Sequence, residues 1–337
     1  MRVLAGDIGG TRARLAICEV DGTTVRRDIQ EVYASRDHDS LEDIARQFIA
    51  SSAPEVRVAC FGVPGPVRGR RAHTTNLPWE LDADRLERNL GIKNVHLIND
   101  VEACARGLAT LASADFIELR AGASGATGNK GLLSAGSGLG EAGLYWDGRS
   151  HRAFACEGGH TDFAPGTERE DKLNAWLRAK FDGHVSWERV LSRPGLVNLV
   201  EFLKEQDPDR DSAAVTTAIA EAQAGGMDGG EAVIRGALRD NDPLSVEALD
   251  WFMEMYGAEA GNVALKYLAA SGMFIAGQIA TKIAGALKTS KFIERFDGKG
   301  RLHPILEAIP IHIVTNEAVA IQGAAYLAAR RARGEND

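Results

Sequence analysis

The stretch VLAGDIGGT, residues 3–11, carries the strongest prediction of the fold. Residues 3–7 have the apolar character of a buried strand, and Asp7 places a carboxylate where this strand ends. The glycine turn Gly9-Gly10-Thr11 follows, and the apolar residues 13–20 form a second strand. Because so short a turn joins only antiparallel neighbours, and a further turn precedes residues 23–33, the first third of the chain opens with a three-stranded meander.

The same pattern returns about 130 residues later. Residues 131–135 form an apolar strand, the turn Gly136-Ser137-Gly138-Leu139-Gly140 follows, and residues 141–145 form the partner strand. Two strand, glycine turn, strand units in one chain indicate an internal duplication.

Strands and helices alternate over the rest of the chain, which predicts an α/β fold. We expect further strands at 56–63, 95–98, 272–277 and 311–314, and helices at 40–52, 82–90, 101–111, from 279 onward and at 318–330. Residues 121–130 have the composition of a small polar loop, and residues 167–268 are expected to be mostly helical.

Composition excludes several classes of protein. A chain of 337 residues is long enough for two lobes, and 45% hydrophobic residues indicate a folded protein. The net charge of -8 disfavours nucleic acids and anionic membranes as partners. The four cysteines form no Cys-x-x-Cys pair, and neither a signal peptide nor a membrane-spanning run is present, so we expect a cytoplasmic protein with reduced thiols.

The two glycine turns are candidates for binding phosphate. In the first, Gly9, Gly10 and Thr11 offer amide groups and a hydroxyl to an anion while Asp7 faces magnesium. The alternative is a hairpin turn capped by an aspartate. The turn around Ser137 repeats the device, so two turns could hold one triphosphate, and the Gly-x-x-x-x-Gly-Lys-Ser/Thr pattern of Walker-type proteins does not occur.

Asp100 is a candidate general base. It lies where the strand at 95–98 runs into the helix at 101–111, so its carboxylate could accept a proton from an attacking hydroxyl. The alternative is that Asp100 is the N-cap of that helix.

A second polar group lies around residue 160. Glu157 and His160 flank two glycines and suit several hydroxyls of a polyol, and the alternative is a metal site formed by both with Asp162. Glu188 lies in the first turn of a predicted helix, where the helix dipole favours a negative charge in any case.

Together these segments closely resemble the bacterial glucokinase family, within the actin-like, hexokinase and heat-shock-seventy group of ATPases. The resemblance extends from Gly6 to about Leu327 and rests on the joint order of seven motifs. These motifs are GDIGGT at 6–11, NLPW at 76–79, IND at 98–100, GSGLG at 136–140, EGGH at 157–160, ERVLS at 188–192 with GL at 195–196, and FIAG at 274–277.

The resemblance implies a two-lobed actin-like, ribonuclease H-like ATPase fold with ATP and sugar in the cleft between the lobes. The small domain would comprise residues 1–110 plus about 315–337, and the large domain residues 111–314. The family implies an ATP-dependent phosphorylation of glucose at its 6-hydroxyl, in the cytoplasm and feeding glycolysis, by a homodimer that uses Mg²⁺.

The family also implies a role for each motif. Two sets of residues match the family's binding residues, one set for ATP and one for the sugar. The first set is Asp7, Gly9, Gly10, Thr11, Ser137 and Gly138, with Gly277 on the adenosine side and Asp7 holding Mg²⁺ through water. The second set is Asn99, Asp100, Glu157, His160 and Glu188, with Asp100 as the base.

Three positions depart from the family pattern. Ser137 replaces a threonine and keeps its hydroxyl, whereas Gln278 and Thr281 replace a common glycine and proline after Gly277. A side chain at residue 278 is expected to narrow the nucleotide site, so it bears on the choice of phosphoryl donor.

Three other functions compete with this interpretation. A hexose or N-acetylhexosamine kinase of the repressor and kinase group would carry a cysteine-rich zinc motif after Glu-x-Gly-His, but His160 is followed by TDFAP at 161–165. A sugar-sensing regulator would add a helix-turn-helix and basic charge. A filament-forming or chaperone ATPase would hydrolyse ATP without sugar.

Overall fold

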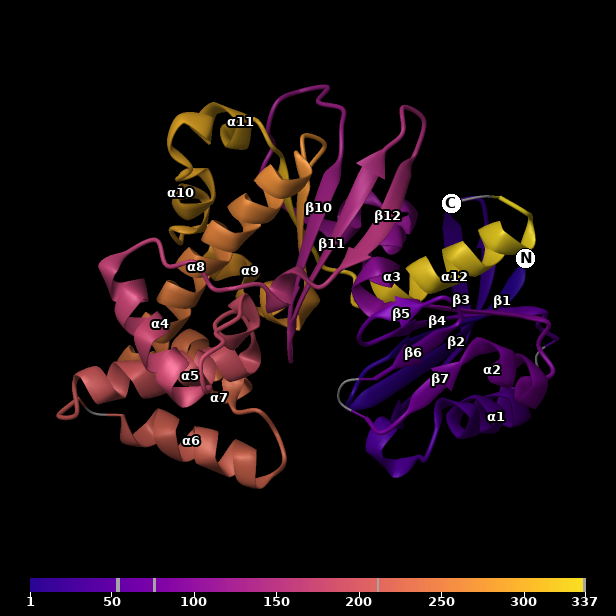
Figure 1. Cartoon of the computed structure of the whole chain (residues 1–337), viewed down its shortest axis with the longest axis horizontal. Coiled ribbons are helices and arrows are strands. Elements are labelled where there is room, and N and C mark those ends of the chain that lie inside the picture. The colour runs from indigo at the N-terminus through magenta and orange to yellow at the C-terminus, as the bar shows by residue number, and fades with distance from the viewer. Residues whose placement is uncertain (53–54, 75–76, 211, 336–337) are drawn as a thin grey trace. The chain divides into compact units, whose positions relative to one another are not determined.

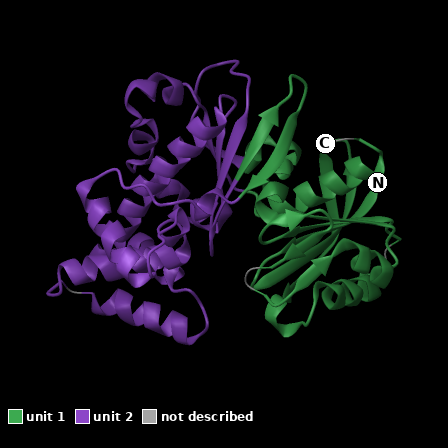
Figure 2. Ribbon diagram, viewed as in Figure 1, with its two compact units in different colours: residues 1–115, 142–156, 316–337 green, residues 116–141, 157–315 purple. Residues whose placement is uncertain are grey.

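The computed structural model describes residues 1–52, 55–74, 77–210 and 212–335, so Asn76 of the NLPW motif lies outside the described residues. The chain forms two compact units (Figure 2). Unit 1 contains Met1–Asp115, Ala142–Cys156 and Asn316–Asp337, and unit 2 contains Phe116–Glu141 and Glu157–Thr315. Each unit is therefore built from segments that are distant in the sequence.

The sheet of unit 1 has the strand order β3-β2-β1-β4-β8. The predicted meander is confirmed: β1 (Arg2–Ile8), β2 (Arg12–Asp21) and β3 (Thr24–Ala34) are antiparallel neighbours. On the other side of β1, β4 (Val58–Val63) and β8 (Asn94–Asn99) run parallel to it. The carboxyl ends of β1, β4 and β8 therefore lie at one edge of the sheet.

Helices cover both faces of this sheet (Figure 1). Helices α1 (Leu41–Ser52) and α2 (Ala83–Leu90) share a core with even-numbered β1 residues such as Leu4, whereas α3 (Asp100–Gly107) and α12 (Val319–Ala332) share one with odd-numbered residues. Because side chains alternate along a strand, the odd-numbered residues of β1 face α3. Asp7 is one of these residues.

Two glycines allow α3 and α12 to cross closely. A Cβ atom at Gly323 would overlap Ala103 O, and one at Gly107 would overlap Val319 O. Any larger residue at either position would push the helices apart, because backbone atoms cannot yield as a flexible side chain can.

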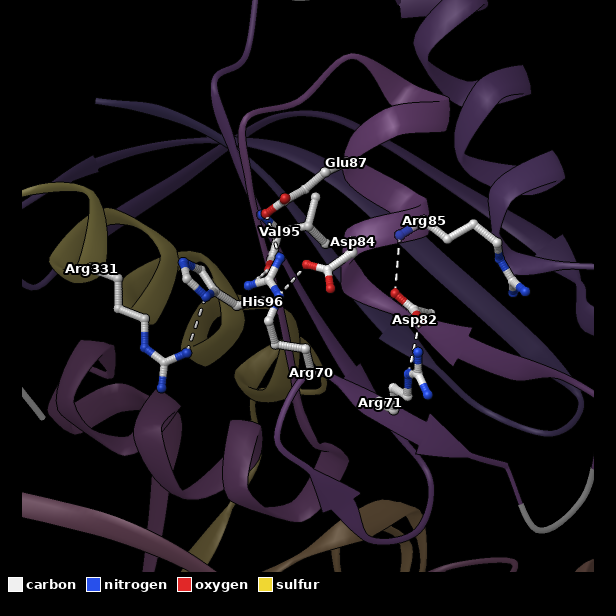
Figure 3. Close-up of polar contacts among 9 residues, drawn as sticks. All are labelled: Arg70, Arg71, Asp82, Asp84, Arg85, Glu87, Val95, His96 and Arg331. Atoms are coloured by element: carbon white, nitrogen blue, oxygen red, sulfur yellow. Dashed lines mark hydrogen bonds and ion pairs between the residues drawn. The ribbon is translucent and has the colours of Figure 1, made fainter.

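A cluster of ion pairs fastens α2 to the rest of unit 1 (Figure 3). The guanidinium of Arg70, which follows β5 (Val67–Arg68), donates to Asp84 and Glu87 at 2.6 Å each. Glu87 also accepts from Val95 N in β8 at 2.9 Å. These contacts hold the start of β8 against α2, which is a structural role. The short strands β6 (Arg71–His73) and β7 (Glu80–Asp82) complete a three-stranded sheet with β5.

Unit 2 repeats the parallel part of this sheet. Strands β10 (Lys130–Ala135), β13 (Met273–Ala276) and β14 (Ile311–Val314) are parallel neighbours, and β11 (Leu139–Trp146), which begins in unit 2, follows β10 through the second glycine turn. The order β11-β10-β13-β14 matches β2-β1-β4-β8, which confirms the predicted duplication. Strand β9 (Phe116–Arg120) adds an antiparallel edge beyond β14, and β12 (His151–Cys156) belongs to unit 1; neither strand was predicted.

The segment predicted to be helical provides most of the core of unit 2. Its longest helix, α8 (Pro243–Tyr267), begins at the N-cap Asp242, whose side chain accepts from Ser245 N at 2.7 Å. Buried residues lie on most of its sides, as expected for a central helix. The other helices of unit 2 are α4 (Glu168–Lys180), α5 (Arg193–Gln206), α6 (Ala213–Ala224), α7 (Gly230–Arg235), α9 (Gly277–Leu287), α10 (Phe292–Asp297) and α11 (His303–Glu307). No helix in the described ranges has both the length and the apolar character needed to cross a membrane.

Candidate active site

Asp7 lies at the carboxyl edge of the sheet of unit 1, opposite Gly62 of β4. Its Oδ2 is 3.5 Å from the guanidinium of Arg14, its partner across the β1–β2 hairpin. Burial raises the pKa of Asp7, and the charge of Arg14 opposes this rise. Arg14 is a cation beside the predicted phosphate turn and was not identified from the sequence. Its position three residues after Thr11 is the sequence feature that could have identified it.

The first glycine turn is held by local contacts. Gly9 N donates to Arg12 O at 2.9 Å, Ser35 Oγ donates to Gly9 O at 2.7 Å, and Ser35 N donates to Thr11 O at 3.0 Å. The amide of Gly9 therefore serves the turn itself. Phosphate binding by Asp7, Gly9, Gly10 and Thr11 stays a prediction.

Asn99 provides the N-cap of α3. Its Oδ1 accepts from Val101 N at 2.9 Å and from Glu102 N at 3.0 Å, and its Nδ2 donates to Gly65 O at 3.3 Å. Asp100 is the first residue of the helix, and its Oδ1 also accepts from Val101 N at 2.9 Å. The capping role considered for Asp100 is thus carried mainly by the preceding residue.

Asp7 and Asp100 lie in one neighbourhood. Burial raises the pKa of Cys104 in α3, and the negative charges of both aspartates raise it further. Gly62 lies in β4, between β1 and β8, and a Cβ atom there would be 3.4 Å from Asp100 Cα. The predicted phosphate carboxylate and the predicted base therefore share the carboxyl edge of β1, β4 and β8.

In unit 2, the second glycine turn is supported from outside. Gly136 N donates to Gly138 O at 2.8 Å, and Arg193 N donates to Gly136 O at 2.8 Å. Glu188 Oε2 accepts from Leu139 N at 2.9 Å and lies 2.5 Å from where a Cβ atom of Gly138 would be. Glu188, predicted to bind sugar, therefore also contacts the predicted phosphate turn.

Glu157 and His160 lie on the sugar turn, by which we mean residues 157–160, and both side chains are half exposed. The turn contains a 3-10 helix at Gly158–His160, and Glu157 Oε2 is 4.0 Å from His160 Nε2. A Cβ atom at Gly159 would overlap Leu139 O, so this turn packs on the first residue of β11.

Glu188 is brought to the sugar turn by a second short segment. It lies in the 3-10 helix Trp187–Arg189, where Trp187 N donates to Thr161 O at 3.0 Å. The buried ring of Trp187 packs edge-on against Phe163, with 4.9 Å between ring centroids. Glu157, His160 and Glu188 thus surround the start of β11.

Gly277 joins the same region. It adopts a φ of +90°, which favours glycine, and a Cβ atom there would overlap Ala135 O just before the second turn. Gln278 is exposed in the first turn of α9, and Thr281 Oγ1 donates to Gly277 O at 3.4 Å. The predicted effect of Gln278 on the phosphoryl donor stays a prediction.

The site residues fit a metal ion only in part. Among the residues that the structure describes, no group of three His, Cys, Asp or Glu side chains is arranged to hold a metal. Asp162, considered as a ligand with Glu157 and His160, instead pairs with His184 at 3.1 Å. A single carboxylate at Asp7 suits a Mg²⁺ ion that keeps most of its ligands as water and substrate phosphates.

Comparison with known proteins gives a consistent result. A family model described as Glucokinase matches residues 4–331. A glucokinase from Nostoc punctiforme is 40% identical over 97% of this chain and 99% of its own length. The crystal structure of a glucokinase from an Antarctic psychrotroph has a TM-score of 0.80 at 27% identity, covering 98% of this chain and 99% of its own. A ROK family glucokinase from Streptomyces griseus, solved with glucose and AMPPNP, has a TM-score of 0.67 at 20% identity, covering 98% of this chain and all of its own, and shows the shared fold.

Proposed function

The chain belongs to the glucokinase family and catalyses the ATP-dependent phosphorylation of glucose, and we propose that Asp100 is the base of this reaction. The observation that carries this assignment is the capping of α3 by Asn99, which gives the helix its N-cap one residue before Asp100. The position of Asp100 near Asp7 at the strand ends supports it further.

Glucose is proposed to bind through Glu157, His160 and Glu188 of unit 2, together with Asn99 and Asp100 of unit 1. The carboxylates accept hydrogen bonds from sugar hydroxyls, and His160 can donate or accept. A sugar lacking one of these hydroxyls would leave a polar group of the site unpaired, which discriminates by roughly 1 to 3 kcal/mol.

ATP is proposed to bind through the two glycine turns. Asp7, Gly9, Gly10 and Thr11 would serve its phosphates from unit 1, and Ser137 and Gly138 from unit 2, with Gly277 on the adenosine side. The guanidinium of Arg14 lies beside Asp7, where it would offset the negative charge of the phosphates. Mg²⁺ held by Asp7 through water would neutralise charge on the phosphates.

The proposed reaction is an in-line transfer. Asp100 accepts the proton of the sugar 6-hydroxyl, O6 forms a bond to the γ-phosphorus, and the bond from that phosphorus to the β–γ bridging oxygen breaks to release ADP. Because the base and the sugar-binding carboxylates lie in different units, the reaction requires a conformation in which both serve the same sugar. Excluding water in that conformation would prevent wasteful ATP hydrolysis.

We also propose a location and an assembly for the chain. The location is the cytoplasm, where ATP is available, and the assembly is a homodimer. The proposed small domain comprises residues 1–110 plus about 315–337, and the proposed large domain residues 111–314. Analytical ultracentrifugation of the purified chain would test the homodimer.

The substitution Asp100→Asn tests the base. The amide keeps the size of the side chain but cannot accept the O6 proton, so kcat should fall by about 10² to 10⁴. The melting temperature should stay close to that of the wild type, because Asn99 still caps α3. As a control, Asn99→Ala should lower stability by about 1 kcal/mol. A kcat within about threefold of the wild type, measured by a coupled assay with glucose and ATP, would show that Asp100 is not the base.

A further inference from the structure

Two buried carboxyl groups lie beneath the sugar turn and take no part in the proposed reaction. Glu141 is the third residue of β11 and is 1% exposed, and Glu259 lies within α8 and is fully buried. The two groups are electrostatically coupled, because the negative charge of Glu259 raises the pKa of Glu141. Because burying a charged group is costly, such a pair calls for an explanation.

Glu141 is in direct contact with the sugar turn. A Cβ atom at Gly158 would overlap Glu141 Oε2 and lie 2.5 Å from its Cδ. The neighbouring Gly159 packs on Leu139 in the same way, and Leu139 N is held by Glu188. Residues 139–141 are therefore the surface on which the sugar turn rests.

We propose that Glu141 is a positioning residue for glucose binding, whose carboxyl group, paired with Glu259, supports the sugar turn through Gly158. This inference rests on the proposed sugar-binding role of Glu157 and His160. Glu141 would not contact the sugar; it would fix the backbone from which those two side chains reach it.

The surroundings of the pair determine which carboxyl group carries the proton. Glu259 accepts from Asn262 Nδ2 at 2.7 Å and from Lys266 Nζ at 3.1 Å, and Lys299 Nζ donates to Asn262 Oδ1 at 2.7 Å. Glu141 is then the group that carries a proton, because burial and the negative charge of Glu259 raise its pKa and two adjacent carboxylates would repel.

The charge on Glu141 should therefore change at mildly alkaline pH. Burial raises the pKa of Glu141 to about 8, the charge of Glu259 adds to this rise, and the charge of Lys266 opposes it. The other titratable side chains of this region are Glu157 and His160 on the turn and Glu188, which accepts from Leu139 N. Since the folded state favours the neutral form, the support is intact below pH 8 and is lost as the pH rises through 8.

The pH dependence of glucose affinity tests whether the charge on Glu141 controls the support of the sugar turn. Calorimetric titration of the full chain with glucose should show the dissociation constant rising about tenfold between pH 7 and pH 9, the linkage expected when only the neutral form binds well. Glu141→Gln stays neutral and should keep the affinity at pH 7 and abolish the rise. Glu170→Gln is a matched control, because Glu170 is equally buried in unit 2 but pairs with Arg295, and it should keep the wild-type profile.

A double-mutant cycle tests the contact with Gly158. Gly158→Ala should weaken glucose binding at least tenfold, because its methyl group meets the Glu141 carboxyl group. Adding Glu141→Ala removes that carboxyl group and should restore affinity to within about threefold of Glu141→Ala alone. Melting curves should show all variants folded at the assay temperature, and if Gly158→Ala does not fold, the pH profile of Glu141→Gln decides.

The outcomes separate this inference from the proposed function. The positioning role is overturned if Glu141→Gln shows the pH profile of the wild type, or if the double variant does not regain glucose affinity. In either case, glucose binding by the wild type leaves the proposed function standing. A wild type that binds no glucose at any pH would overturn both.

Discussion

The two glycine turns occupy matching places in the duplicated fold, yet they are supported in different ways. The turn at Gly9–Thr11 is held by Arg12 of the next strand and by Ser35, which follows β3. The turn at Gly136–Gly138 is held by Glu188 and Arg193, which come from a segment about fifty residues later.

This difference predicts separate functions for the two turns. The support of the first turn is confined to the meander and its end, so it should bear on the proposed phosphate site alone. The support of the second turn includes Glu188, which also belongs to the proposed sugar site. Changes at the second turn should therefore affect both substrates, and changes at the first turn only ATP.

The larger expected effect is that of Glu188→Ala. It removes a charged acceptor from Leu139 N and, in the proposed site, from the sugar, a loss of about 1.5 to 3 kcal/mol that corresponds to roughly 10- to 150-fold. Both the KM for ATP and the KM for glucose should rise, as measured by initial rates over a grid of both substrates. Glu188→Gln keeps an acceptor for Leu139 N, so its KM for ATP should stay within about threefold of the wild type. An increase in the KM for glucose alone in Glu188→Ala would break the comparison.

The smaller expected effect is that of Ser35→Ala. This substitution removes the hydrogen bond to Gly9 O, worth about 0.5 to 1.5 kcal/mol, so the KM for ATP should rise by roughly 2- to 13-fold. The dissociation constant for glucose, measured by calorimetry without nucleotide, should not change. A weakening of glucose binding comparable to the effect on ATP would show that the first turn also supports the sugar site.

Much of the fold could be predicted because its signals are local. The meander, the duplication and the helix at 82–90 follow from strand periodicity, short turns and helical periodicity. Strands β9 and β12 were missed because their residues are at most half-buried and lack the apolar run of a central strand.

The residues of the proposed site come from motif order, whereas their supporting contacts could not be predicted. Motif order suggested Asp100 and Glu188, but only the structure shows that Asn99 caps α3 and that Glu188 accepts from Leu139 N. Glu141 and Glu259 are 118 positions apart in the sequence, and no local pattern links them. Contacts of this kind depend on how β11 packs against α8, which composition and spacing do not specify.

The central proposal is a division of labour, with the proposed base in unit 1 and most of the proposed sugar-binding side chains in unit 2. Equilibrium binding of glucose, measured by calorimetry for Asp100→Asn and Glu157→Gln against the wild type, tests it most directly. Asp100→Asn should bind glucose within about threefold of the wild type despite its loss of turnover. Glu157→Gln should bind about 10- to 150-fold more weakly, because it loses a charged acceptor worth about 1.5 to 3 kcal/mol. The reverse result, with glucose binding lost in Asp100→Asn and kept in Glu157→Gln, would contradict the account.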